Sequence, residues 1–238
     1  MTIGEPPFAA GVEVVGVDGD DTLWRCQDLF DAAETELADL LAPWADAPDV
    51  VRRIHEVERD NVRLYGFGVK AWTLSMLELT LSLSGGRAPG ALLERVLDMG
   101  RDMLGGPVDV LPGAAEAVAA LGGTHAVVLV TKGDLVDQQR KLAASGLAPA
   151  FAHVEIVSDK TQATYGELLR LLECPPERFL MVGNSEVSDV VPVLSLGGWA
   201  VHVPYRTTWS LERAEPVQHD RRLTVASLAD VPPLLSAG

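Results

Sequence analysis

The stretch EVVGVDGDDTLW, residues 13–24, joins a short apolar run to a cluster of carboxylates. Its first half is rich in β-branched residues and ends on Asp18, a pattern typical of a buried parallel strand. Asp20 follows two residues later, and Gly19 between them allows the backbone to turn sharply. We therefore expect a strand over 13–18 that brings two carboxylates together at one edge of a sheet.

Further apolar runs lie downstream and are separated by helical patterns. The predicted strands are HAVVLVT at 125–131, HVEIVS at 153–158, FLMVG at 179–183 and WAVHVP at 199–204. The predicted helices run from Pro112 to Gly122-Gly123, from Asp134 to Ala144 and from Thr161 to Leu172. This alternation predicts an α/β fold with a three-layer, Rossmann-like, doubly wound parallel sheet, whose site lies at the carboxyl ends of the strands.

Residues 27–107 contain no convincing strand, and a loop of that length is not expected inside a compact domain. Apolar residues recur there at helical spacing in four groups: Phe30 to Leu41, Val50 to Val57, Leu74 with Leu77 and Leu81, and Leu93 to Met103. Asp49 is the expected N-cap of the second helix, and Gly85-Gly86 and Gly105-Gly106 are expected helix stops. The sequence thus predicts a four-helix insertion at 27–107, within a core made of 1–26 and 108–238.

Composition limits the classes of partner. The chain has 34 acidic and 19 basic residues and a formal charge of −15, which disfavours binding to nucleic acid. A local cradle of amides, a lysine and a cation could still bind a small phosphate ester. The first residues lack a signal-peptide pattern. No segment has the run of about 18 consecutive apolar residues that a membrane span needs. We therefore expect a cytoplasmic protein with no membrane partner, whose two cysteines are reduced thiols.

The carboxylate pair and the second strand end carry the first chemical signals. Asp18 and Asp20 would repel each other unless a cation neutralised them, and hard oxygen ligands suit Mg²⁺. One carboxylate could attack phosphorus while the other transfers protons, although a solvated Asp-rich turn is the simpler interpretation of this segment alone. Thr131 and Lys132 end the second strand before a helix, where they form either an anion cradle or a simple cap.

Two further motifs follow the third and fourth strands. Lys160 lies just beyond the third strand, and Asn184 and Asp189 follow the fourth. Each has an ordinary interpretation, as a solvated lysine or as a carboxylate beside a helix N-terminus. Because polar groups follow four successive parallel strands, however, all of them should meet at one edge of the sheet.

Taken together, these residues resemble the four motifs of the haloacid dehalogenase-like (HAD) superfamily. The motifs are DxDxT at 18–22, Thr131, Lys160 and GNxxxxD at 183–189. The resemblance spans about 8 to 205, and the helical insertion is similar to the C1-type cap of subfamily I. It implies an enzyme whose cap selects the substrate.

The resemblance implies a role for each motif residue. Asp18 would be the nucleophile that becomes aspartyl-phosphate, and Asp20 the general acid and base. Thr131 and the backbone amide of Lys132 would hold the phosphoryl group, while Lys160 would neutralise charge. The expected reaction is magnesium-dependent hydrolysis of a small phosphorylated metabolite.

The expected Mg²⁺ site departs from the family pattern. Its ligands would be the Asp18 carboxylate, the Asp20 carbonyl and a group from the fourth motif. Many family members have Asp where this chain has Asn184, so Asp189 or Glu186 could supply the missing charge.

Other activities remain open at this stage. Haloacid dehalogenases generally do not retain the second aspartate of the first motif, so Asp20 argues against dehalogenation. A phosphomutase, or a catalytically weak phosphometabolite-binding protein, is an alternative. The sequence indicates neither the substrate nor the oligomeric state. The candidate specificity residues of the cap are Arg52, Arg53, Arg63, Tyr65, Lys70 and Trp72.

Overall fold

The computed structural model describes residues 11–235, so the N-terminal stretch without a signal-peptide pattern lies outside the described residues. The chain divides into two compact units. The described part of the first unit covers 11–25 and 108–235, and the second unit covers 26–107. The second unit is therefore an insertion after the first strand.

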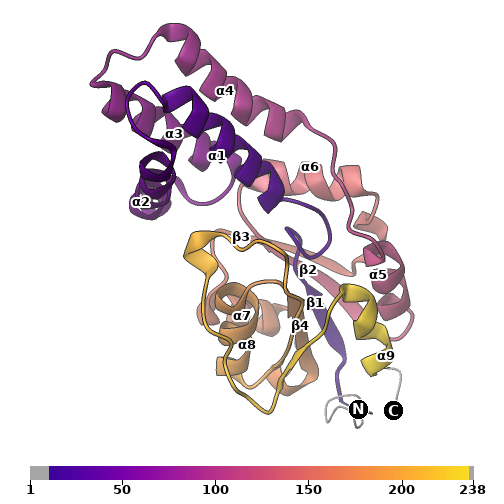
Figure 1. Ribbon diagram of the computed structural model, residues 1–238. Coiled ribbons are helices and arrows are strands. Elements are labelled where there is room, and N and C mark those ends of the chain that lie inside the picture. Colours follow the sequence, from indigo (N-terminus) through magenta and orange to yellow (C-terminus); the bar gives the residue numbers. More distant parts are fainter. Residues whose placement is uncertain (1–10, 236–238) are drawn as a thin grey trace. The chain divides into compact units, whose positions relative to one another are not determined.

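The first unit is built on a parallel sheet of six strands in the order β3-β2-β1-β4-β5-β6 (Figure 1). The strands are β1 Val14–Val17, β2 Ala126–Lys132, β3 His153–Val157, β4 Phe179–Gly183, β5 Trp199–His202 and β6 Arg222–Thr224. This confirms the predicted doubly wound sheet, whose chain order reverses between β1 and β4. The sequence analysis missed β6, because three residues with two polar side chains carry no strand pattern.

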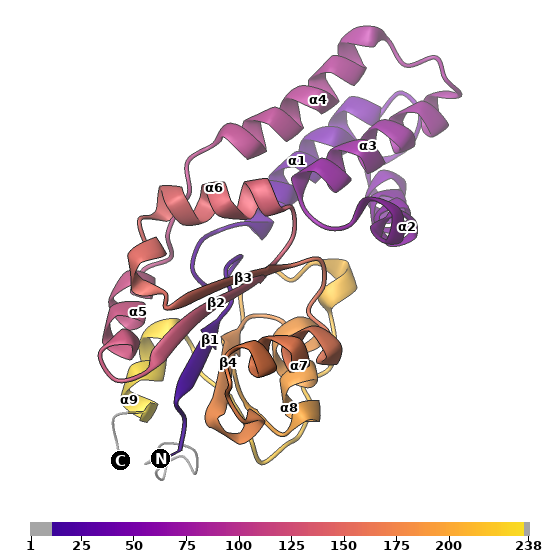
Figure 2. The same ribbon diagram turned by 180° about the vertical axis from the view of Figure 1, so that it is seen from behind.

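Helices cover both faces of the sheet (Figure 2). Apolar residues of α5 (Ala114–Gly122), α6 (Leu135–Ser145) and α9 (Val231–Leu235) share one core with Val17, Leu129 and Val182. On the other face, α7 (Gln162–Leu171) and α8 (Val191–Leu196) pack against Val128, Val130 and Met181. The three-layer prediction is confirmed, although α5 begins two residues after Pro112, with Gly113 at its N-cap in a left-handed conformation.

Four helices make up the second unit: α1 Gln27–Leu41, α2 Ala47–Tyr65, α3 Val69–Ser84 and α4 Gly90–Gly105. Leu37, Ile54, Met76 and Val96 are fully buried in their shared core. This burial explains the helices, since an amphipathic helix is stable mainly through the apolar face it packs. The predicted four-helix insertion is confirmed.

Two details of the insertion differ from the sequence prediction. The N-cap of α2 is Asp46, whose side chain accepts from the Asp49 amide at 2.9 Å, so Asp49 lies inside the first turn. Of the predicted apolar face of α3, Leu74 and Leu81 are 46% and 43% exposed. Trp72 and Met76 are buried instead, because the core-facing side of this helix also contains small hydroxyl residues that break the leucine pattern.

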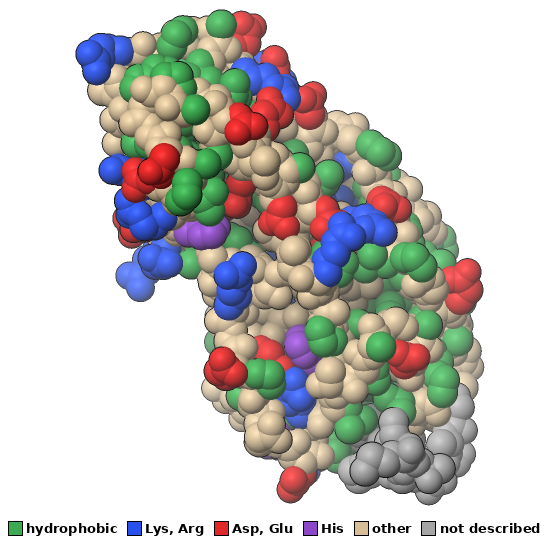
Figure 3. Space-filling view, viewed as in Figure 1, with side chains coloured by type: hydrophobic (Ala, Val, Ile, Leu, Met, Phe, Trp, Pro, Cys, Tyr) green, Lys and Arg blue, Asp and Glu red, His purple; other side chains and the backbone are tan. Residues whose placement is uncertain are grey.

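Charged side chains of both signs lie on the surface (Figure 3). Figure 3 shows acidic and basic side chains interspersed on one face, and the described residues visible there form no continuous basic band. Within the described residues, no helix is both long and apolar enough to cross a membrane.

Candidate active site

Asp18 lies directly after β1, inside a tight turn. Its backbone amide donates to the Val182 carbonyl of the neighbouring strand at 2.9 Å. Its carboxylate oxygen Oδ2 accepts the Thr22 hydroxyl at 3.1 Å. Asp21 takes a positive φ of 63°, and the Leu23 amide closes the turn on the Gly19 carbonyl at 2.8 Å. The turn thus fixes Asp18 at the carboxyl edge of the sheet, 6% exposed.

Gly19 packs closely against the side chains of Trp24 and Thr131. The sequence analysis attributed its role to a sharp backbone turn, but the positive φ belongs to Asp21. A Cβ at Gly19 would lie 2.9 Å from the Trp24 ring and 3.0 Å from the Thr131 hydroxyl oxygen. A glycine here therefore lets the end of β2 approach the turn after β1.

Lys160, between β3 and α7, bridges two buried carboxylates. Its ammonium donates to Asp18 Oδ1 and, at 2.6 Å, to Asp189 Oδ1. The three side chains are between 1% and 8% exposed. Asp189 Oδ2 accepts the Ser185 amide at 3.0 Å, and a side chain at Gly183 would overlap this carboxylate. The groups predicted from three separate strand ends therefore form one cluster.

Burial controls the charges in this cluster. It raises the pKa of Asp18 to about 8, with the charge of Asp189 adding to the rise and Lys160 opposing it. Burial lowers the pKa of Lys160, but the charges of Asp18 and Asp189 outweigh it and hold that pKa well above its usual value. The cluster therefore favours additional positive charge beside Asp18.

Asp20 belongs to a separate cluster that includes α6. Its Oδ1 accepts the Trp24 indole N–H at 2.6 Å, and its Oδ2 accepts the Gln138 amide at 2.8 Å. The Lys141 ammonium donates to both oxygens, at 2.9 and 3.1 Å. Burial raises the pKa of Asp20, yet the Lys141 charge and these hydrogen bonds bring it below its usual value. Asp20 is therefore held as a carboxylate.

Thr131 and Lys132 end β2 beside the turn that carries Asp18. Thr131 is 1% exposed, and its hydroxyl oxygen packs close to Gly19. The Lys132 ammonium donates to the Ser188 hydroxyl at 2.9 Å and forms an ion pair with Glu212. The Lys132 side chain is thus engaged by residues that follow β4 and β5, whereas the sequence analysis assigned phosphate binding to its backbone amide.

Asn184 directly follows β4, the strand that pairs with β1. The His202 ring donates to the Asn184 carbonyl at 2.9 Å, and the residue is buried, with 9% exposed. Glu186 instead pairs with Arg222 of β6, and the His202 ring nitrogen Nδ1 lies 3.3 Å from its carboxylate. The structure therefore places Glu186 with the strand that the sequence analysis missed.

This arrangement matches a known family. A family model described as haloacid dehalogenase-like hydrolase matches residues 12–192. A haloacid dehalogenase-like family hydrolase from Xanthomonas campestris is 39% identical, with a TM-score of 0.85, over 95% of this chain and 91% of that one. The chain belongs to the haloacid dehalogenase-like hydrolases.

More distant members share the fold. An L-2-haloacid dehalogenase from Xanthobacter autotrophicus is 17% identical, with a TM-score of 0.67, over 95% of this chain and 99% of that one. A putative HAD hydrolase from Bacillus subtilis bound to magnesium is 19% identical, with a TM-score of 0.64, over 94% and 99%. No curated protein matches the chain. These similarities establish the family and the fold. Which reaction of the family the chain catalyses has to be argued from the residues of the site.

The HAD fold raises the question of whether these residues fit magnesium. Within residues 11–235, no three His, Cys, Asp or Glu side chains gather into a metal cluster. Magnesium needs only one or two carboxylates, however, and retains several waters. Asp18 and the amide oxygen of Asn184 are hard donors from adjacent strands, and Asp18 favours a cation. This donor set fits a sparse magnesium site.

Several residues of this HAD site were not foreseen. Trp24, Gln138 and Lys141 hold Asp20, and the Tyr165 hydroxyl donates to the Ser188 carbonyl at 3.1 Å. The other site residues were predicted because they follow the ends of parallel strands. None of these four does so directly, and they were therefore missed. The sequence signal is a polar pair at i and i+3 on the helix after the second strand, and solvated helix faces carry such pairs too.

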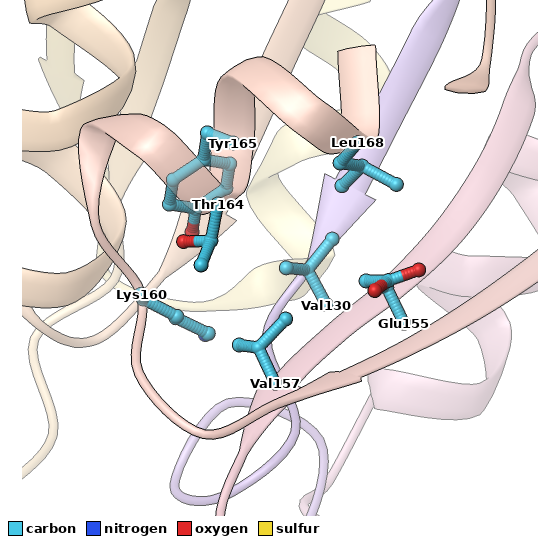
Figure 4. Close-up of a pocket in the computed structure, with 7 residues that line it drawn as sticks. All are labelled: Val130, Glu155, Val157, Lys160, Thr164, Tyr165 and Leu168. Carbon is cyan, nitrogen blue, oxygen red and sulfur yellow. The ribbon is translucent and has the colours of Figure 1, made fainter. Parts of the chain in front are cut away.

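A small pocket flanks Lys160 on the α7 side of the sheet (Figure 4). Its lining comes from β2, β3, α7 and the loop before α7: Val130, Glu155, Val157, Lys160, Thr164, Tyr165 and Leu168. The pocket has no room for a water molecule. It is therefore a packing defect beside the cluster of Asp18, Lys160 and Asp189, and it offers no space for a substrate.

Most of the predicted specificity residues are at least partly exposed, and one is buried. Arg63 and Lys70 are exposed, and Tyr65 is half-buried. Arg52 and Arg53 pair with Asp49 along the exposed side of α2. Trp72 is 2% exposed and packs edge-on against Phe30, with ring centroids 6.1 Å apart. Trp72 is therefore part of the core of the insertion, and the structure contradicts its expected place on a specificity surface.

Proposed function

We propose that the chain is a magnesium-dependent phosphomonoesterase that acts through a covalent aspartyl-phosphate on Asp18. The observation that carries this proposal is Asp20, a partly buried carboxylate two residues beyond Asp18, fixed by three hydrogen-bond donors. An enzyme that must protonate a leaving oxygen and then activate water needs such a group. A displacement of halide from carbon does not.

The first step is an in-line attack of the Asp18 carboxylate on phosphorus. Asp20 is a carboxylate in the free protein, so it takes up a proton together with the substrate. As the bond from phosphorus to the ester oxygen breaks, Asp20 gives that proton to this oxygen. Lys160, already bridging Asp18 and Asp189, offsets negative charge on the phosphoryl oxygens. The Thr131 hydroxyl and the Lys132 amide orient the phosphoryl group.

The second step releases phosphate. A water attacks phosphorus while Asp20 accepts its proton, and the bond from phosphorus to the Asp18 oxygen breaks. Magnesium would be held by the Asp18 carboxylate, the Asp20 carbonyl and the Asn184 side chain, and it supplies charge neutralisation when bound. Asp189 has both oxygens engaged by Lys160 and the Ser185 amide, so we assign it to orienting Lys160.

We further take residues 27–107 as the cap that selects a small phosphorylated metabolite. Dehalogenation is the competing activity, favoured by Asn184 in place of a carboxylate ligand. A phosphomutase would use the same first step but return the phosphoryl group to a substrate. A binding protein would show no turnover.

The test is phosphate release from a panel of small phosphate esters, with magnesium and with chelator, and halide release from 2-haloacids. We expect magnesium-dependent phosphate release that Asp18→Asn abolishes. Arg178→Met, which removes an exposed ion pair with Glu13, is the matched control and should retain full activity. Halide release without phosphate release would overturn the proposal in favour of a dehalogenase. Ligand-induced stabilisation without any turnover would favour a binding protein.

A further inference from the structure

Both carboxylate oxygens of Asp20 are occupied by donors, and two of these donors come from one helix. Gln138 and Lys141 lie three residues apart on α6 and approach the same carboxylate. Each Asp20 oxygen accepts two hydrogen bonds, since Lys141 donates to both and Trp24 and Gln138 donate to one each. The carboxylate is thus fixed against rotation.

The Lys141 ammonium lies at a buried position, where a charged group loses its hydration. Its side chain is only 7% exposed, although it lies on a helix with a solvated face. Its other carboxylate neighbour is Asp137, with 3.4 Å between the ammonium nitrogen and Oδ2. Well-packed apolar residues commonly replace buried ion pairs without loss of stability, so such a pair is poor evidence of a stabilising role. The contact with Asp20 suggests a functional reason for the charge.

Gln138 connects the loop after β1 with the last residue of β2. Its amide group donates to Asp20 Oδ2 at 2.8 Å and to the Lys132 carbonyl at 3.2 Å. The loop after β1 and the end of β2 are therefore held by one side chain. Gln138 Oε1 is buried, and among the described residues it has no hydrogen-bond partner. A buried acceptor left unpaired costs free energy, which a purely structural glutamine would not need to bear.

We propose that Lys141 and Gln138 are positioning residues that orient Asp20 for proton transfer. This inference rests on the proposed phosphomonoesterase function. A proton-transferring carboxylate acts only within hydrogen-bond reach of its partner and in a fixed direction. Loss of either donor lets Asp20 rotate, and a misplacement of about 1 Å can cost on the order of 100-fold in rate.

The test compares Lys141→Met with Arg140→Met. Arg140 lies next to Lys141 on α6 and pairs with the same Asp137, with 3.0 Å between Nη2 and Oδ1. With phenyl phosphate and magnesium, we expect Lys141→Met to lower kcat by about 10- to 100-fold at nearly unchanged KM. The loss should be smaller with p-nitrophenyl phosphate, because its leaving group needs less protonation. Arg140→Met should match the wild-type protein.

A double-mutant cycle separates positioning from a structural role. In an Asp20→Asn background, Lys141→Met should cause no further loss of kcat, because the group it orients can no longer transfer a proton. Multiplicative losses in the cycle, or equal losses on both substrates, overturn the inference. Thermal unfolding shows whether Lys141→Met is folded. If it is not, Gln138→Met takes its place in the same cycle.

The two proposals fail in different ways. A folded wild-type protein that releases no phosphate from any ester overturns the proposed function and the positioning role with it. An active wild-type protein whose kcat is unchanged by both Lys141→Met and Gln138→Met overturns the positioning role alone.

Discussion

At the residue scale, Lys160 places one buried positive charge against two acidic side chains. Asp18 and Asp189 both contact its ammonium, and all three side chains are almost completely buried. Removal of one partner from a buried ion pair leaves an uncompensated charge, which costs about 3 to 5 kcal/mol.

Lys160→Met should therefore destabilise the protein by an amount in this range and abolish phosphate release. Chemical denaturation measures the free energy of unfolding. The control is Arg178→Met, because Arg178 forms an ion pair whose side chains are more than half exposed, and such pairs contribute about 0 to 1 kcal/mol. Equal destabilisation by the two variants would show that the buried cluster does not hold its charges as described.

Magnesium should stabilise the same cluster. A ligand that binds only the folded state adds about 2.7 kcal/mol at 100 times its dissociation constant. We expect magnesium to raise the Tm of the wild-type protein, and Asp18→Asn to lose most of this rise. Each variant is compared with itself in chelator, so its own change in stability cancels. A rise that persists fully in Asp18→Asn would place the metal elsewhere.

The sequence allowed the residues at strand ends to be predicted, but not those that act from helices. Asp18, Lys160 and Asp189 each follow a parallel strand, and the geometry of a parallel sheet brings them to one edge. Lys141 reaches Asp20 only because of the rotation of α6 about its axis, and a single sequence does not determine that rotation to within one residue. The same limit explains why Trp72 was named a candidate specificity residue although it lies in the core of the insertion.

At the element scale, Asp46 determines where α2 begins. Its carboxylate accepts the Asp49 amide, which has no partner of its own within the first turn of a helix. Asp46→Ala should lower the free energy of unfolding of the insertion by about 1 kcal/mol. Asp60→Ala removes the same charge from an exposed position within α2 and should have little effect. Thermal unfolding monitored by circular dichroism compares them, and equal shifts would contradict the cap.

Helices and strands with a clear apolar periodicity were predicted from the sequence, and those without one were not. Long helices and buried strands have strong periodicity, so all four insertion helices and five strands were found. The predicted apolar face of α3 was wrong because leucines lie on both sides of that helix, and only packing decides which side is buried. Strand β6 is three residues long, and its place in the sheet depends on pairing with β5.

At the scale of the whole molecule, each unit has its own buried core. The two ends of the first unit that flank the insertion lie side by side: Trp24 bridges Val110, and the Arg25 amide donates to the Asp109 carbonyl at 2.9 Å. A few glycine and serine residues can therefore replace residues 26–107 with little loop strain.

This shortened protein should fold cooperatively and keep a magnesium-dependent rise in Tm, since every residue of the proposed site belongs to the first unit. It should have a raised KM for its best phosphate ester, because the proposed cap is gone. Calorimetry and steady-state kinetics measure both properties. A shortened protein that is unfolded in magnesium would show that the two cores are not independent.

The most direct test of the account is the fate of water oxygen during turnover in H₂¹⁸O. If water attacks phosphorus, ¹⁸O appears in the released phosphate, and a peptide containing Asp18 remains unlabelled after many turnovers. If the chain instead forms a carbon ester on Asp18, water attacks the carboxyl carbon, and turnover of a 2-haloacid labels Asp18 itself. The account predicts labelled phosphate and unlabelled Asp18, and a labelled Asp18 would contradict it.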